Sequence, residues 1–302
     1  MAIGVCITSS NGQVDFINGC KNDPGCAKWV DSVYNALTIE ERIAQCFMIA
    51  AYTAGKDYNM DSVFRMVKDG KAGGVIFFKG NPTAQVQWTN RLQSVAKVKI
   101  MVAIDGEWGL AMRLDSTISY PKNMALGAMA DDALIYAMGR DVARQCKRMG
   151  IHVNFAPVVD VNNNARNPVI NDRSFGENKE KVAAKAIEFM RGMQDQGVLA
   201  CAKHFPGHGD TDKDSHYDLP VISKNQYQLE ATELYPFRQI INAGVGSVMV
   251  AHLRLPQIDS VRLAASLSEK VINKLLREQL GFSGLVFSDA LNMKGVSKFF
   301  KP

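Results

Sequence analysis

A polar segment from Lys203 to His216 holds the densest group of side chains that could do chemistry, with three histidines and three aspartates within fourteen residues. It follows an apolar run and is rich in glycine, which is typical of a loop that carries function. Asp214 and His216 lie close enough in sequence for the carboxylate to orient the imidazole and favour its protonated form. We expect this pair to act as general acid and base on a leaving oxygen. Lys203 and His204, at the end of the apolar run, are expected to donate hydrogen bonds to a substrate.

Two other interpretations of this segment stay open. The histidines His204, His208 and His216 are of a residue type that binds zinc, so a metal-dependent hydrolase is one alternative. Their spacing does not match the His-x-x-x-His of a helix, because Pro206 and Gly207 exclude a helix there. The plainest alternative is a solvated loop with a few capping residues.

A second candidate for chemistry is Asp289, which comes directly after the short apolar run Leu285–Phe287 and Ser288. We expect its carboxylate to emerge at the carboxyl end of a buried strand. A carboxylate in that position is a candidate nucleophile. The alternative is an aspartate that caps the helix after it.

Groups suited to sugar binding follow a third apolar run. Asp105, Glu107 and Trp108 lie together there, and carboxylates beside an aromatic ring are what a pocket for vicinal hydroxyls needs. Arg113 lies a few residues further on. Arg173 lies on a long segment between two apolar runs, where its planar guanidinium can bind hydroxyls or an amide oxygen at two points.

The run Lys203-His204-Phe205-Pro206-Gly207-His208-Gly209, followed by Asp214-Ser215-His216, resembles the signature of glycoside hydrolase family 3 in its β-N-acetylglucosaminidase branch. The resemblance extends from about Trp29 to Val296. It implies a retaining hydrolase that removes terminal non-reducing β-N-acetylglucosamine through a covalent glycosyl-aspartate intermediate. It favours peptidoglycan fragments as the substrate. We expect no cofactor and no metal ion.

The same resemblance implies a role for each candidate. Asp289 corresponds to the nucleophile, and His216 corresponds to an unusual histidine acid/base that Asp214 supports. The positions expected to hold the terminal sugar are Asp105, Arg113, Arg173, Lys203 and His204. One motif departs from the family: Asp-x-Glu-Gly-Gly is more usual where this chain has Trp108 in the fourth place. We expect Trp108 to form a wall of the pocket.

The elements that must position these residues alternate between short apolar runs and amphipathic helical stretches. The expected strands cover residues 47–51, 74–78, 100–104, 153–159, 199–202, 247–251 and 285–287. Continuous apolar strands separated by helices indicate a parallel sheet covered on both faces. Several runs end in polar residues, including Asp160 and His252, as in a TIM-like (β/α)8 barrel. A doubly wound sheet would carry a glycine-rich phosphate loop, which this sequence lacks.

Seven strands can be counted, and the sequence ends at Pro302, soon after the seventh. We therefore expect an α/β fold of the TIM-like barrel type that lacks its last βα unit. Residues 1–27 are expected to form an irregular lead-in, and residues 28–302 a single catalytic domain. A C-terminal segment or further domain in the full gene would complete the barrel. A catalytically impaired carbohydrate-binding barrel is the remaining alternative.

Composition narrows the class of protein further. Hydrophobic residues make up 47% and charged residues 22%, as in ordinary globular domains. The net charge is +5, but lysine and arginine alternate with acidic residues, so no nucleic-acid partner is expected. No apolar run is long enough for a membrane span. The N-terminus lacks the features of a signal peptide, which slightly favours a cytoplasmic location for the protein. If the N-terminus is processed, a periplasmic or exported protein is the alternative.

Overall fold

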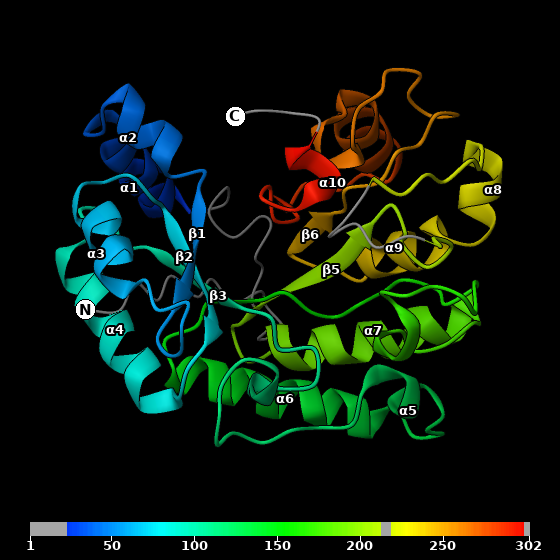
Figure 1. Ribbon diagram of the computed structural model, residues 1–302, viewed down its shortest axis with the longest axis horizontal. Helices are drawn as coiled ribbons and strands as arrows, with labels where there is room; N and C mark the ends of the chain where they lie inside the picture. The colour runs from blue at the N-terminus through cyan, green and yellow to red at the C-terminus, as the bar shows by residue number, and fades with distance from the viewer. Residues whose placement is uncertain (1–22, 213–218, 299–302) are drawn as a thin grey trace. The chain divides into compact units, whose positions relative to one another are not determined.

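The computed structural model describes residues 23–212 and 219–298, and within them helices and parallel strands alternate along the chain (Figure 1). The strands are β1 (Met48–Tyr52), β2 (Gly74–Lys79), β3 (Met101–Ile104), β4 (Val153–Asn154), β5 (Leu199–Phe205), β6 (Ser247–Val250) and β7 (Leu285–Ser288). They follow one another in chain order along the sheet. This order lacks the reversal of a doubly wound sheet and is that of a TIM-like barrel. The predicted α/β class is confirmed, and the described residues form no eighth strand.

The helices of the described residues include the expected amphipathic stretches. They are α1 (Pro24–Asn35), α2 (Ile39–Ala44), α3 (Met60–Lys68), α4 (Pro82–Val95), α5 (Asn123–Gly127), α6 (Ala133–Arg148), α7 (Lys179–Gln194), α8 (Gln226–Ala231), α9 (Leu234–Asn242) and α10 (Lys294–Ser297). Short 3-10 turns are η1 (Leu110–Met112), η2 (Asn171–Arg173) and η3 (Ala265–Leu267), and η4 (Lys270–Gln279) is a π-helix. No helix within 23–212 and 219–298 is long and apolar enough to cross a membrane.

Local signals in the sequence explain where the first two helices begin. α1 starts at Pro24, inside the segment 1–27 that was expected to be irregular, because the Asp23 side chain accepts the Gly25 N–H at 2.8 Å and proline suits the first helical position. α2 begins with a reciprocal capping box. Thr38 Oγ1 accepts the Glu41 N–H at 3.2 Å, and Glu41 Oε2 accepts the Thr38 N–H at 2.9 Å.

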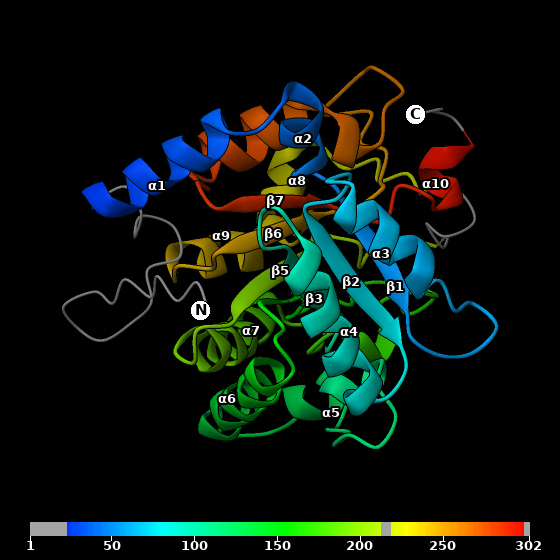
Figure 2. The same ribbon diagram turned by 90° about the vertical axis from the view of Figure 1, so that its left-hand side faces the viewer.

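The chain divides into two compact units, which we describe separately. The first unit contains the residues up to Tyr120 together with Arg140–Phe155 and Gly192–Leu199. Its strands β1, β2 and β3 run side by side (Figures 1 and 2), and β4 pairs with β3. One row of paired residues near the carboxyl ends is completely buried and comprises Ala51, Phe77, Ile104 and Asn154. A closely packed layer of buried residues therefore supports the polar residues that follow these strands.

The second unit contains Pro121–Gly139, Ala156–Arg191 and the residues from Ala200 onward. In it β5, β6 and β7 lie side by side (Figure 2), with Lys203 paired to Met249 and Met249 paired to Phe287. Every residue of β5 is buried, whereas the residues of β7 are exposed or half-buried. The polar residues after β5, β6 and β7 come out at the same edge, because the strands are parallel.

Prolines account for two differences from the expected elements. β4 ends at Asn154 and does not reach residue 159, since Pro157 has no N–H to continue the ladder. The expected helix over 229–242 is divided between α8 and α9. In one continuous helix the ring of Pro236 would clash with the Thr232 carbonyl, so α9 begins at Leu234 with the proline in its first turn. The single catalytic domain over 28–302 stays a prediction.

Candidate active site

In the first unit, Asp105 and Arg113 form an ion pair at the carboxyl end of β3. Arg113 Nη2 donates to Asp105 Oδ2 at 2.7 Å, and 13% of the Asp105 side chain and 25% of the Arg113 side chain are exposed. The Arg113 guanidinium also lies 4.8 Å from the centre of the Phe78 ring, whose face attracts a cation. The structure thus brings together two of the residues that the sequence assigned to the sugar pocket.

The turn that carries Asp105 is held by Asn154, the last residue of β4. Its side chain accepts the Gly106 N–H at 2.8 Å and donates to the Gly106 carbonyl at 3.1 Å. Gly109 has a φ of 92°, and a Cβ there would lie 2.8 Å from the Ile118 carbonyl oxygen. This position therefore requires glycine. Trp108, the expected pocket wall, is half-buried in the same turn.

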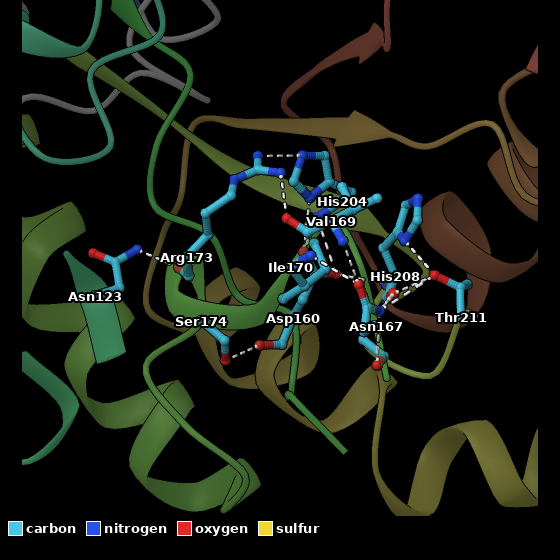
Figure 3. Close-up of polar contacts among 11 residues, drawn as sticks. Asn123, Asp160, Asn167, Val169, Ile170, Arg173, Ser174, His204, His208 and Thr211 are labelled. Carbon is cyan, nitrogen blue, oxygen red and sulfur yellow. Dashed lines mark hydrogen bonds and ion pairs between the residues drawn. The ribbon is translucent and has the colours of Figure 1, made fainter. Parts of the chain in front are cut away.

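In the second unit, Asp160 is the centre of a buried hydrogen-bonded cluster (Figure 3). One carboxylate oxygen accepts the His204 ring Nδ1–H at 2.7 Å, and the other accepts the His208 backbone N–H at 2.6 Å. The His204 backbone N–H adds a bond at 3.2 Å. Burial by itself would raise the pKa of Asp160, but the charge and hydrogen bonds of His204 and His208 outweigh it and lower that pKa. Asp160 is thus held as a carboxylate.

Arg173 determines which His204 nitrogen carries the proton. Arg173 Nη2 lies 3.2 Å from His204 Nε2, and a guanidinium only donates, so Nε2 accepts (Figure 3). The proton of the neutral ring then sits on Nδ1 and is donated to Asp160. Arg173 also donates to the Val169 carbonyl at 3.2 Å, which orients its guanidinium. The sequence-predicted residues Arg173 and His204 therefore act as one hydrogen-bonded unit.

Asn167 fixes the backbone that follows His204. Its Nδ2 donates to the His208 carbonyl at 2.8 Å and to the Gly209 carbonyl at 3.0 Å (Figure 3). The His208 ring lies 2.8 Å from Thr211 Oγ1. Burial, followed by the charge of His204, lowers the pKa of His208 to about 4, although Asp160 and Asp289 act in the opposite direction. The His208 imidazole is therefore neutral near neutral pH.

Asp289 lies directly after β7 in the second unit. Its backbone N–H donates to the Val250 carbonyl at 2.9 Å, and its Oδ1 accepts the Ala290 N–H at 2.8 Å. The described residues make no hydrogen bond to Oδ2. The helix-capping alternative is wrong, since Met293 is the N-cap of α10. Asp289 is a half-buried carboxylate with one oxygen engaged by its own turn.

Lys203 is buried on β5, where its carbonyl accepts the Val159 N–H at 2.8 Å. The expected acid/base pair, Asp214 and His216, lies outside the described residues. Within the described ranges, no three His, Cys, Asp or Glu side chains are grouped as a metal site. Both ring nitrogens of His204 are already hydrogen-bonded, which disfavours this residue as a ligand.

Two residues of the buried cluster received no role from the sequence. Asp160 was visible only as a polar residue after an apolar run, and Asn167 gave no signal at all. The partners of Asp160 lie 44 and 48 residues further along the chain, so no local spacing reveals them. The position of Asp160 directly after an apolar run was the only signal that the sequence offered.

Known proteins are similar to this chain in both sequence and fold. The family model of the glycosyl hydrolase family 3 N terminal domain matches residues 38–302. Beta-hexosaminidase A of Pseudoalteromonas piscicida is 38% identical over 254 residues, which cover 76% of this chain and 42% of that protein. A glycoside hydrolase family 3 beta-N-acetylglucosaminidase from Paenibacillus sp. str. FPU-7 superposes with a TM-score of 0.81 at 38% identity, over 88% of this chain and 51% of that one.

A third similar protein, NagZ from Neisseria gonorrhoeae in complex with N-trifluoroacetyl-D-glucosamine, has a TM-score of 0.73 at 31% identity. That match covers 82% of this chain and 75% of NagZ. The chain spans about half the length of the Paenibacillus protein and less than half of the Pseudoalteromonas one. On its sequence and its order of strands, the chain belongs to the glycosyl hydrolase family 3 N-terminal domain family.

Proposed function

We propose that this protein is a retaining glycoside hydrolase that removes terminal non-reducing β-N-acetylglucosamine, with peptidoglycan fragments as its substrate. The similar proteins named as beta-hexosaminidase and beta-N-acetylglucosaminidase support the activity. The N-trifluoroacetyl-D-glucosamine bound to NagZ supports the choice of sugar.

The observation that carries the proposal is the placement of Asp289. Its carboxylate follows a parallel strand directly, caps no helix, and has one oxygen occupied by the Ala290 N–H. The other oxygen, Oδ2, is the one we assign to attack on the anomeric carbon. Attack forms a glycosyl–aspartate ester and breaks the bond to the leaving oxygen.

The proton needed by the leaving oxygen comes, in this proposal, from the imidazolium of His216, which Asp214 supports. The now neutral His216 then takes a proton from water as the water attacks the anomeric carbon. The ester breaks, and the sugar leaves with its original configuration. An imidazole titrates near neutral pH, so this acid needs no burial to raise its pKa, unlike a glutamic acid.

The remaining residues are assigned to the terminal sugar. Asp105 accepts hydrogen bonds from hydroxyls, while Arg113, Arg173 and Lys203 donate to hydroxyl or acetamido oxygens. The pairing of Arg173 with His204 supports a role for both, because a guanidinium fixed through His204 and Asp160 is pre-oriented for a ligand.

An assay with an aryl β-N-acetylglucosaminide, with and without a chelator, tests the proposal. We expect release of the aryl group in both cases, and proton NMR should detect the β-anomer of the sugar first. Loss of activity on chelation would instead indicate the metal-dependent hydrolase. Binding of N-acetylglucosamine without any turnover would indicate a carbohydrate-binding barrel.

A further inference from the structure

A buried histidine connects β6 to the segment that carries Asp289. His252 follows β6 closely and is completely buried. Its Nε2 lies 3.0 Å from the Ala290 carbonyl oxygen, and its Nδ1 lies 2.7 Å from Ser266 Oγ. A carbonyl oxygen only accepts, so Nε2 carries the proton and donates it. In the neutral ring, Nδ1 then accepts the proton of the Ser266 hydroxyl.

Ser266 is itself held in place. It lies in the 3-10 turn η3, whose Ala265 N–H donates to the Leu253 carbonyl at 2.7 Å. Leu253, the residue after His252, therefore helps to position the Ser266 hydroxyl. This hydroxyl in turn selects the tautomer of His252. Serine, imidazole and carbonyl form one chain of hydrogen bonds in the second unit, and it ends at the peptide group after Ala290.

The end of β6 thus holds the Asp289 segment on both sides. Before the carboxylate, the Val250 carbonyl accepts the Asp289 N–H at 2.9 Å. After it, His252 donates to the Ala290 carbonyl, which also accepts the Met293 N–H at 3.0 Å. The Ala290 N–H in turn holds Asp289 Oδ1 at 2.8 Å. The direction of the carboxylate depends on this short stretch of backbone.

Side-chain packing contributes little to holding this segment. The β7 residues are exposed or half-buried, 47% of Leu285 is exposed, and Ala290 is exposed as well. The next buried side chains after Asp289 are Met293 and Val296. Hydrogen bonds from β6 therefore replace the packing that would otherwise fix the backbone at Asp289.

We propose that His252 is a positioning residue for the nucleophile, holding the Ala290 peptide so that Asp289 Oδ2 faces the anomeric carbon. The inference rests on the proposed role of Asp289. His252 does not touch the sugar, so its loss should leave ground-state binding intact and slow the attack itself. A carboxylate displaced by about 1 Å is expected to react about 100-fold more slowly.

Two substitutions of similar polarity separate the two hydrogen bonds of His252. In His252→Asn the shorter amide can still accept from Ser266 but does not reach Ala290. In His252→Gln the amide nitrogen takes the place of Nε2 and can donate to the Ala290 carbonyl. We expect His252→Asn to lower kcat about 100-fold and His252→Gln to lower it less than about tenfold. KM and inhibition by free N-acetylglucosamine should stay within about threefold in both.

The substrate should be an aryl glycoside with an activated leaving group, which needs little protonation, and kcat/KM should be measured beside kcat, because kcat/KM reports the attack by Asp289 whichever step limits turnover. Ser266→Ala provides a milder variant that keeps the imidazole. We expect a fall in kcat of about tenfold, because the Nδ1 partner of the donating tautomer is lost. Ser247→Ala is the matched control, since it removes a buried hydroxyl that donates to the Ala200 carbonyl at 2.7 Å, at the start of β6. It should leave kcat unchanged.

Asp289→Ala, measured in parallel, distinguishes the two possible failures. If Asp289→Ala keeps wild-type activity, or the wild type has no turnover, the proposed function fails and the inference fails with it. If Asp289→Ala is inactive while His252→Asn keeps kcat within about threefold of wild type, only the inference is overturned. It is also overturned if Ser266→Ala and Ser247→Ala lower kcat equally.

Discussion

Asp160 accepts the Nδ1–H of His204 at 2.7 Å, and this bond directs the other ring nitrogen of His204 toward Arg173. The buried carboxylate also accepts two backbone N–H groups, those of His204 and His208. The Asp160 side chain therefore fixes, together with Arg173, the tautomer of His204, a residue that we propose binds the substrate, and it also fixes the path of the loop after β5. Both functions fail together if Asp160 is replaced.

Asp160→Asn should destabilise the fold. The amide offers one oxygen where three N–H donors now share two, and its own N–H groups would face donors. We expect the free energy of unfolding to fall by about 2–4 kcal/mol, measured by urea denaturation. Asp172→Asn is the control, because Asp172 pairs with Lys122 at an exposed site and should cost less than about 1 kcal/mol. Equal losses would contradict the central role of Asp160.

Stability should depend on the titration of His208. Burial and the charge of His204 lower the pKa of His208 to about 4, whereas a histidine of the unfolded chain titrates near about 6.5. Between these values the unfolded chain binds more protons than the folded one. The contribution of neutral His208 to the free energy of unfolding is therefore complete above about pH 6.5. It is lost as the pH falls toward 4, at about 1.4 kcal/mol per pH unit.

Urea denaturation of the wild type and His208→Asn between neutral pH and pH 4 measures this contribution. The variant should show the shallower dependence on pH, since it lacks the titrating imidazole. Identical slopes would mean that other groups cause the acid destabilisation.

Arg173→Lys should weaken substrate binding although it keeps the charge. A lysine ammonium cannot bond His204 and the Val169 carbonyl with two fixed nitrogens as the guanidinium does. We expect KM for an aryl β-N-acetylglucosaminide to rise about tenfold with a smaller change in kcat. An unchanged KM would remove Arg173 from the sugar-binding residues.

His216→Ala should affect substrates according to their leaving groups. A poor leaving group needs a proton as its bond breaks, while an activated aryl group does not. Turnover of an alkyl or disaccharide substrate should fall at least about 100-fold more than turnover of a nitrophenyl glycoside. Equal losses on both substrates would show that His216 is not the acid.

Buried apolar runs made the strands predictable, because a parallel strand covered on both faces leaves little room for polar residues. The same runs correctly placed Asp105 and Asp289 directly after strands, whereas Lys203, expected at a strand end, lies within β5, which continues to Phe205. The sequence also contains the causes of two differences from the expected elements. Pro157 accounts for the early end of β4, and Pro236 accounts for the break between α8 and α9.

The hydrogen-bonding partners within the site were not predictable in this way. His252 bonds to a backbone carbonyl 38 residues further along the chain, and a carbonyl leaves no trace in the sequence. Asp160 collects its donors from β5 and the loop after it, which only the folded chain brings near. Residue types at strand ends predicted the chemistry, whereas the orientation of each group depends on such long-range bonds.

Trapping the covalent intermediate tests the nucleophile most directly. A fluorinated N-acetylglucosaminyl fluoride reacts quickly in the first step and slowly in the second, so the glycosyl-enzyme accumulates. Mass spectrometry of the intact protein and of its peptides should find one sugar per chain, attached to the peptide that contains Asp289, and none in Asp289→Ala. Turnover of the reagent without any labelled peptide, or a label on another residue, would contradict the assignment of Asp289.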